Sequence, residues 1–126
     1  MNGKPYRILF VDDDIHLLKL GERIIQGLGY NVISHSKSTD ALEIFRDLPN
    51  QFDLVITDYR MPEMNGAELS KEILKITPDI PIIMCSGFSS DFSEEDAHSL
   101  GINLFIRKPL MKKDFAKLIE EALNLK

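Results

Sequence analysis

The sequence predicts an α/β domain in which one parallel sheet carries helices on both faces. Five short apolar segments alternate with five segments whose apolar residues recur at helical spacing. Such an alternation is typical of parallel strands joined by crossover helices. Three apolar segments are continuous runs, as expected for strands covered on both faces, at 8–11, 54–56 and 82–84. The 126 residues suit a single domain, which we expect over 1–126, with its core at about 7–125 and no effector domain.

The first half of the chain holds two strand–helix units. The first strand, at 7–11, is stopped by three aspartates, and an amphipathic helix follows at 15–28. The second strand, at 31–36, mixes apolar and polar residues, so we expect it at an edge of the sheet. A second amphipathic helix occupies 38–48 and ends before Pro49.

The third strand, at 54–58, is an apolar run that ends on the carboxylate of Asp58. A turn follows it, and Asn65 with Glu68 three residues later resembles a capping box. This pair predicts that a third helix begins at Asn65, and the sequence Thr-Pro ends that helix at 77.

The last two units contain the weaker patterns. The fourth strand is predicted at 82–86, and a short helix with little apolar content opens at Ser93. The fifth strand, at 103–107, carries polar residues and is the second expected edge. A final helix has its apolar stripe at 115–122.

Composition and charge disfavour several classes of function. The net charge of −5 and the pI near 5.1 argue against direct binding of nucleic acid. No apolar run reaches the roughly 18 residues of a membrane span, and no signal peptide precedes the first strand, so we expect no direct membrane contact. The single cysteine, Cys85, fits a reducing compartment, and we expect a cytoplasmic location.

Polar side chains stand at the ends of four predicted strands. They are Asp12, Asp13, Asp58, Ser86 and Lys108. Because the carboxyl ends of parallel strands share one edge of the sheet, we expect these groups to meet in one shallow cleft. Clustered carboxylates repel one another unless a cation lies among them, and Mg²⁺ prefers oxygen ligands and is usually shared with a phosphate. Together with the ammonium of Lys108 and the hydroxyl of Ser86, these carboxylates predict an aspartyl-phosphate site with Asp58 as the nucleophile.

Each of these residues also has a purely structural interpretation. The aspartates at 12–14 could cap the first helix, and we expect Asp14 to do so. Asp58 could form a turn, Lys108 could lie in a solvated loop, and Ser86 could be a buried structural hydroxyl. Their joint placement at four strand ends favours the functional interpretation.

Four motifs resemble the receiver domain of response regulators in two-component and phosphorelay signalling. They are Phe10-Val11-Asp12-Asp13-Asp14, Thr57-Asp58-Tyr59-Arg60-Met61-Pro62-Glu63-Met64-Asn65-Gly66, Ser86-Gly87 and Phe105-Ile106-Arg107-Lys108-Pro109. The match runs from about 7 to 125. The resemblance implies a flavodoxin-like (βα)5 three-layer sandwich with a five-stranded parallel sheet in the order 2-1-3-4-5, which agrees with the two expected edge strands.

The resemblance also implies the chemistry of the site. Asp58 would accept a phosphoryl group from a histidine kinase or a histidine phosphotransfer protein. Asp12, Asp13 and Asp58 would bind Mg²⁺ with the backbone carbonyl of Arg60, and Mn²⁺ can substitute. Lys108 would contact the phosphoryl group. The chain would thus be a regulatory phosphoacceptor that catalyses only its own phosphorylation and dephosphorylation, and a monomer or a weak dimer formed on phosphorylation.

By the same resemblance, Ser86 and Phe105 are the switch pair that acts on the face made by the fourth helix, the fifth strand and the fifth helix. Ser86 replaces a more frequent threonine and keeps the hydroxyl. Phe105 stands where tyrosine is common, so we expect its inward state to be well populated before phosphorylation. The run at 85–89 resembles receivers attached to hybrid histidine kinases.

Three rival functions can be distinguished from this one. A flavodoxin-like cofactor binder needs a phosphate loop rich in glycine and hydroxyl groups after the first strand, where this chain has three aspartates. An aspartyl-phosphate hydrolase normally carries its nucleophile at the end of the first strand, in an Asp-x-Asp spacing. A phosphate-independent interaction module would not require the complete set of site residues.

Overall fold

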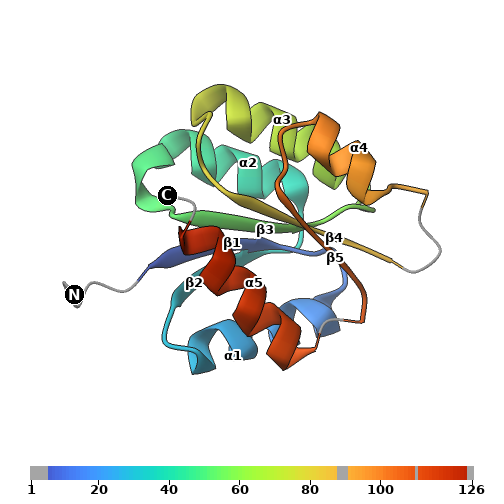
Figure 1. The fold of residues 1–126 in the computed structure, drawn as a ribbon. Coiled ribbons are helices and arrows are strands. Elements are labelled where there is room, and N and C mark those ends of the chain that lie inside the picture. Colours follow the sequence, from blue (N-terminus) through green and yellow to red (C-terminus); the bar gives the residue numbers. More distant parts are fainter. Residues whose placement is uncertain (1–5, 88–90, 110, 125–126) are drawn as a thin grey trace.

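The computed structural model describes residues 6–87, 91–109 and 111–124, which form a three-layer α/β sandwich (Figure 1). Its five strands are parallel and lie in the order β2-β1-β3-β4-β5, which confirms the predicted sheet. The strands are β1 (Arg7–Val11), β2 (Asn31–His35), β3 (Leu54–Asp58), β4 (Ile82–Ser86) and β5 (Leu104–Arg107). The two strands with mixed composition, β2 and β5, are the edges, as expected.

Helices cover both faces of this sheet (Figure 1). They are α1 (Ile15–Gly27), α2 (Ser38–Asp47), α3 (Gly66–Ile76), α4 (Glu94–Ser99) and α5 (Lys112–Asn124). Helices α1 and α5 pack on one face, and α2, α3 and α4 pack on the other. Among the described residues, no helix combines the length and apolar character needed to span a membrane.

The core consists of two apolar layers, one on each face of the sheet. Alternate residues of β1 divide between them, since Ile8 and Phe10 join the layer under α1 and α5 while Leu9 and Val11 join the other. All four are at most 1% exposed. A fully buried side chain of this size contributes about 1.5–3 kcal/mol, so the continuous apolar runs keep the three central strands in place.

Local capping signals fix where the helices begin. Asp14 caps α1, because its carboxylate accepts hydrogen bonds from the N–H groups of His16 and Leu17 at 2.9 and 3.2 Å. The predicted capping box of α3 is present, with reciprocal bonds of 2.9 Å between Asn65 and Glu68. Both expectations are therefore confirmed.

Several element boundaries differ from the sequence prediction. The strand predicted at 31–36 ends at 35, and the one predicted at 103–107 begins at 104. The first and second helices end one residue early, at 27 and 47. A short 3₁₀ turn, Pro49–Gln51, was not predicted, because three residues are too few to show an apolar period.

Gly66 allows the end of β3 to approach the start of α3 closely. Its N–H donates to the carbonyl of Tyr59 at 2.7 Å, and a Cβ atom at this position would collide with the backbone oxygen of Asp58. The turn that follows Asp58 is thereby held tight against the sheet. This packing places Asp58 on a rigid support at the carboxyl edge of the sheet.

Candidate functional site

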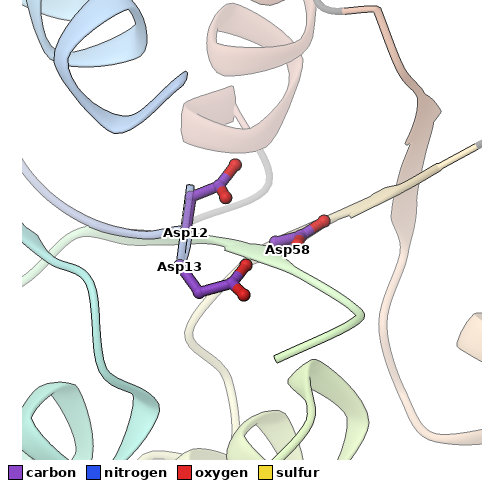
Figure 2. Close-up of side chains that lie close together, drawn as sticks. All are labelled: Asp12, Asp13 and Asp58. Atoms are coloured by element: carbon purple, nitrogen blue, oxygen red, sulfur yellow. The ribbon is translucent and has the colours of Figure 1, made fainter. Parts of the chain in front are cut away.

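Three carboxylates from two neighbouring strand ends meet at the carboxyl edge of the sheet (Figure 2). Asp12 and Asp13 directly follow β1, and Asp58 is the last residue of β3. One ligand atom from each lies within 4.8 Å of the others. Asp12 and Asp58 are buried, at 1% and 6% exposed, whereas Asp13 is exposed. The cluster therefore has a buried floor and one side open to solvent.

Lys108 brings a positive charge to this floor from the end of β5. Its Nζ lies 3.0 Å from an oxygen of Asp12 and 3.0 Å from an oxygen of Asp58. Its backbone N–H donates to the carbonyl of Ser86 at 2.9 Å, which ties the segment after β5 to the end of β4. The ammonium thus bridges two carboxylates that would otherwise repel each other directly.

Burial and mutual repulsion control how these groups titrate. Burial, reinforced by the charge of Asp12, raises the pKa of Asp58 to about 6, although Lys108 opposes the change. Burial also raises the pKa of Asp12, against the opposing effects of the Asp14 N–H and of Lys108. Burial alone would lower the pKa of Lys108, but the two carboxylates outweigh it and the pKa is raised. One ammonium among three carboxyl groups leaves a site that favours a further cation.

A cavity of about 330 Å³ opens above the cluster. Its lining residues are Asp12, Asp13, Asp14, Leu17, Asp58, Arg60, Gly87 and Lys108. The donor atoms that the three carboxylates offer are all oxygen, and the open side leaves room for water ligands. This donor set fits Mg²⁺, which takes oxygen ligands in octahedral geometry and keeps several waters. That the backbone carbonyl of Arg60 is a further ligand of this ion stays a prediction.

Ser86 lies at the end of β4 as predicted, but its side chain is fully buried and Gly87 lines the cavity in its place. Its hydroxyl oxygen has no hydrogen-bond partner among the described residues. A buried polar group left in this state costs about 1–3 kcal/mol. The hydroxyl is therefore available to an acceptor that is brought to this edge of the sheet.

Phe105 is half-buried in β5 and lies on the same face of the sheet as Ser86. In the pairing of β4 with β5, Phe105 stands opposite Met84 and Arg107 stands opposite Ser86. Alternate residues share one face of a sheet, so these four side chains emerge on the side covered by α3 and α4. The predicted switch residues are thus two positions apart in register.

Two residues that contact this region were not predicted from the sequence. Arg107 donates from Nη1 to the carbonyl of Gly87 at 3.0 Å, but an arginine at a strand end gives no distinctive signal. Phe92 stacks on Tyr59, the residue directly after Asp58. An apolar residue just before the helix cap Ser93 is the pattern of a hydrophobic staple, and this signal could have identified Phe92 as anchored.

Comparison with known proteins finds a matching family model and related sequences. Residues 8–120 match the model of the family described as response regulator receiver domain. The chain is 35% identical over 124 residues to transcriptional regulatory protein GlrR of Escherichia coli (strain K12), a match that covers 98% of this chain and 28% of that protein. It is 34% identical over 117 residues to sensor kinase CckA of Brucella abortus (strain 2308), which covers 93% of this chain and 12% of that protein.

Among solved structures, the fold is similar to a response regulator receiver domain protein from Clostridium thermocellum. The TM-score is 0.89 at 33% identity, and the match covers 94% of each chain. The chain spans less than a third of the length of the two curated relatives named above.

Proposed function

Because this chain belongs to the response regulator receiver domain family, we propose that Asp58 is the residue that accepts the phosphoryl group. The observation that carries the proposal is the place of Asp58 at the end of a central strand. There it is buried, it lies 3.0 Å from the ammonium of Lys108, and two further carboxylates are close to it. In a module of two-component signalling, a carboxylate at the end of a buried central strand and beside an ammonium is well placed to accept the phosphoryl group.

The proposed reaction forms an acyl phosphate. A carboxylate oxygen of Asp58 bonds to phosphorus while the phosphorus–nitrogen bond of a phosphohistidine breaks, and the electron pair leaves with the imidazole. Lys108 already contacts Asp58 and compensates the negative charge that the phosphoryl oxygens bring. The chain turns over no free substrate, so its role is regulatory and its catalysis is limited to its own phosphorylation and dephosphorylation.

We also propose Mg²⁺ as the cation of the site, with Mn²⁺ as a substitute. Asp12, Asp13 and Asp58 would hold it, together with the backbone carbonyl of Arg60. When bound, the ion supplies charge neutralisation to the phosphoryl oxygens. The all-oxygen donor set and its open side support this assignment.

The switch would begin at Ser86. Its buried hydroxyl, unpaired among the described residues, can donate a charge-assisted hydrogen bond to a phosphoryl oxygen on Asp58. Movement of Ser86 toward Asp58 opens space into which Phe105 can turn. The change then reaches the face made by α4, β5 and α5, which would meet the output partner.

The donor would be a histidine kinase or a histidine phosphotransfer protein, and the exchange would take place in the cytoplasm. The acidic charge of the chain disfavours direct contact with nucleic acid. Its relatives include both a transcriptional regulatory protein and a sensor kinase, so a receiver of a hybrid kinase stays a prediction. We propose that the chain is a monomer or forms a weak dimer on phosphorylation.

The direct test of the proposal is intact mass after incubation with acetyl phosphate. The wild-type chain should gain the mass of one phosphoryl group with Mg²⁺ and none with a chelator, and Asp58→Asn should gain none. Asp79→Asn, which changes an exposed carboxylate before β4, is the matched control and should label like wild type. Full labelling of Asp58→Asn would refute the assignment, and no labelling of wild type would favour a phosphate-independent interaction module.

A further inference from the structure

Three aromatic rings form a column from the residue after Asp58 to the edge strand β5. Tyr59 stacks on Phe92, with ring centroids 4.2 Å apart and planes inclined by 18°. Phe92 in turn meets Phe105, with centroids 6.3 Å apart and planes inclined by 38°. Phe92 is only 7% exposed, so the middle ring is enclosed between the other two and the core.

The Tyr59 end of the column is fixed to the sheet. The Tyr59 N–H donates to the carbonyl of Cys85 at 2.8 Å, and the Tyr59 carbonyl accepts from Gly66 at 2.7 Å. Its backbone is therefore held between β4 and the start of α3. Phe92 therefore stacks on a side chain whose backbone is anchored at two points.

The Phe105 end of the column is covered by Arg107. The guanidinium carbon lies 5.2 Å from the centroid of the Phe105 ring, within the range of a cation–π contact. The same side chain donates to the carbonyl of Gly87, the residue after Ser86. Arg107 thus contacts both the ring and the segment that carries Ser86.

We propose that Phe92 and Arg107 are positioning residues that hold the Phe105 ring in its resting place and so oppose the switch. This inference rests on the proposed function, because it concerns the movement of Phe105 that follows phosphorylation of Asp58. A tyrosine hydroxyl could hold such a ring by hydrogen bonding, and Phe105 has no hydroxyl. Here the contacts with the Phe92 ring and with the Arg107 guanidinium supply the restraint.

The proposal changes the expected resting state. A ring that turns inward gives up its contacts with Phe92 and Arg107, so these contacts favour the resting conformation. The resting conformation is then more populated than the loss of the hydroxyl alone would predict. A ligand that requires the inward state binds with an apparent affinity reduced by the population of that state.

The test is the affinity for beryllofluoride, a mimic of the aspartyl phosphate, measured with saturating Mg²⁺. Phe92→Leu keeps an apolar side chain and removes the ring, and it should bind beryllofluoride about 2- to 10-fold more tightly, the range expected for loss of one aromatic pair. Phe52→Leu is the matched control. Phe52 is similarly buried, at 5% exposed, and stacks on Phe45. It precedes β3, however, and so lies at the amino end of the strands, away from the carboxyl edge that holds Asp58. Its affinity should equal that of wild type.

Arg107→Lys provides a second variant that keeps the net charge and lies at an exposed position. It should tighten binding about 2-fold, the size expected for an exposed cation–π contact, because lysine reproduces neither the planar contact with the ring nor the geometry of the bond to Gly87. The accompanying readout is NMR of the apo proteins. Amide signals of Ser86 and Phe105 in both variants should move along the line that joins wild-type apo to wild-type beryllofluoride form, toward the bound end.

The possible results separate the two proposals. If wild type binds beryllofluoride while both variants bind with unchanged affinity, or if their signals scatter off that line, the restraint is refuted and the proposed function stands. If wild type itself binds no beryllofluoride in the presence of Mg²⁺, the proposed function fails and the restraint fails with it. Should Phe92→Leu not fold, Arg107→Lys alone decides.

Discussion

Replacing Asp58 by asparagine should stabilise the metal-free protein at neutral pH. The pKa of this carboxyl rises from its ordinary value of 3.8 to about 6 in the folded chain, with burial as the main cause. At pH values between these two, the folded state binds more protons than the unfolded state, so stability falls as the pH rises through this window. Above pH 6 the full cost is present, at most about 3 kcal/mol at about 1.4 kcal/mol for each pH unit.

The expected gain for Asp58→Asn is therefore about 1–3 kcal/mol at pH 7.5. It should shrink toward zero near pH 4, where the folded wild-type carboxyl is protonated. Urea unfolding in the presence of a chelator at both pH values measures it, with Asp79→Asn as the control that should show neither effect. The reasoning is refuted if Asp58→Asn is less stable than wild type at pH 7.5, or if its gain is the same at both pH values.

Three further predictions concern the neighbours of Asp58. Mg²⁺ at 100 times its dissociation constant should stabilise wild type by about 2.7 kcal/mol, which is measured as a rise in melting temperature. Asp13→Asn should lose this rise, and an equal rise in that variant would exclude the Asp13 carboxylate as a ligand. Asp14→Ala should cost about 0.5–2 kcal/mol in urea unfolding through loss of the α1 cap, whereas Asp13→Asn should cost less than about 1 kcal/mol; the reverse order would assign the cap to Asp13. Ser86→Ala should reduce the beryllofluoride-induced NMR shift changes at residues 86–108, while the variant still gains the phosphoryl mass. Shift changes confined to residues 30–50 in wild type would contradict the proposed path of the switch from Ser86 to the face made by α4, β5 and α5.

Much of this fold was predictable because its signals are local. The apolar runs of β1, β3 and β4 are buried on both faces, and the mixed composition of β2 and β5 matches their place at the edges. Asp14 and the Asn65–Glu68 pair cap the helices that they were expected to cap. Each of these features depends on residues within one turn or one strand.

Convergence of the carboxylates was also predictable, since it follows from strand direction alone. Parallel strands place Asp12, Asp13 and Asp58 at one edge, and Lys108 arrives there from β5. Phosphoryl acceptance by Asp58 and cation binding by the three carboxylates stay predictions, which the experiments above test. Topology could not tell that Asp12 and Asp58 are buried while Asp13 is exposed, because that depends on how α1 and the turn after β3 pack.

The contacts that the sequence does not predict join residues far apart in the chain. Phe92 meets Tyr59 across 33 positions, and Arg107 reaches Gly87 across 20. No periodicity or cap links such pairs, and an isolated phenylalanine or arginine has many equivalent interpretations. Only the three-dimensional arrangement shows that both contact Phe105, the residue proposed to turn in the switch.

The central claim, that Asp58 accepts a phosphoryl group from phosphohistidine, is tested most directly by transfer from a radiolabelled donor. A kinase core or histidine phosphotransfer protein from the same genome, labelled on its histidine, is mixed with the chain in the presence of Mg²⁺. Label should leave the donor and appear on wild type and on Asp79→Asn, and none should reach Asp58→Asn. Label that reaches Asp58→Asn as fast as it reaches wild type would contradict the claim.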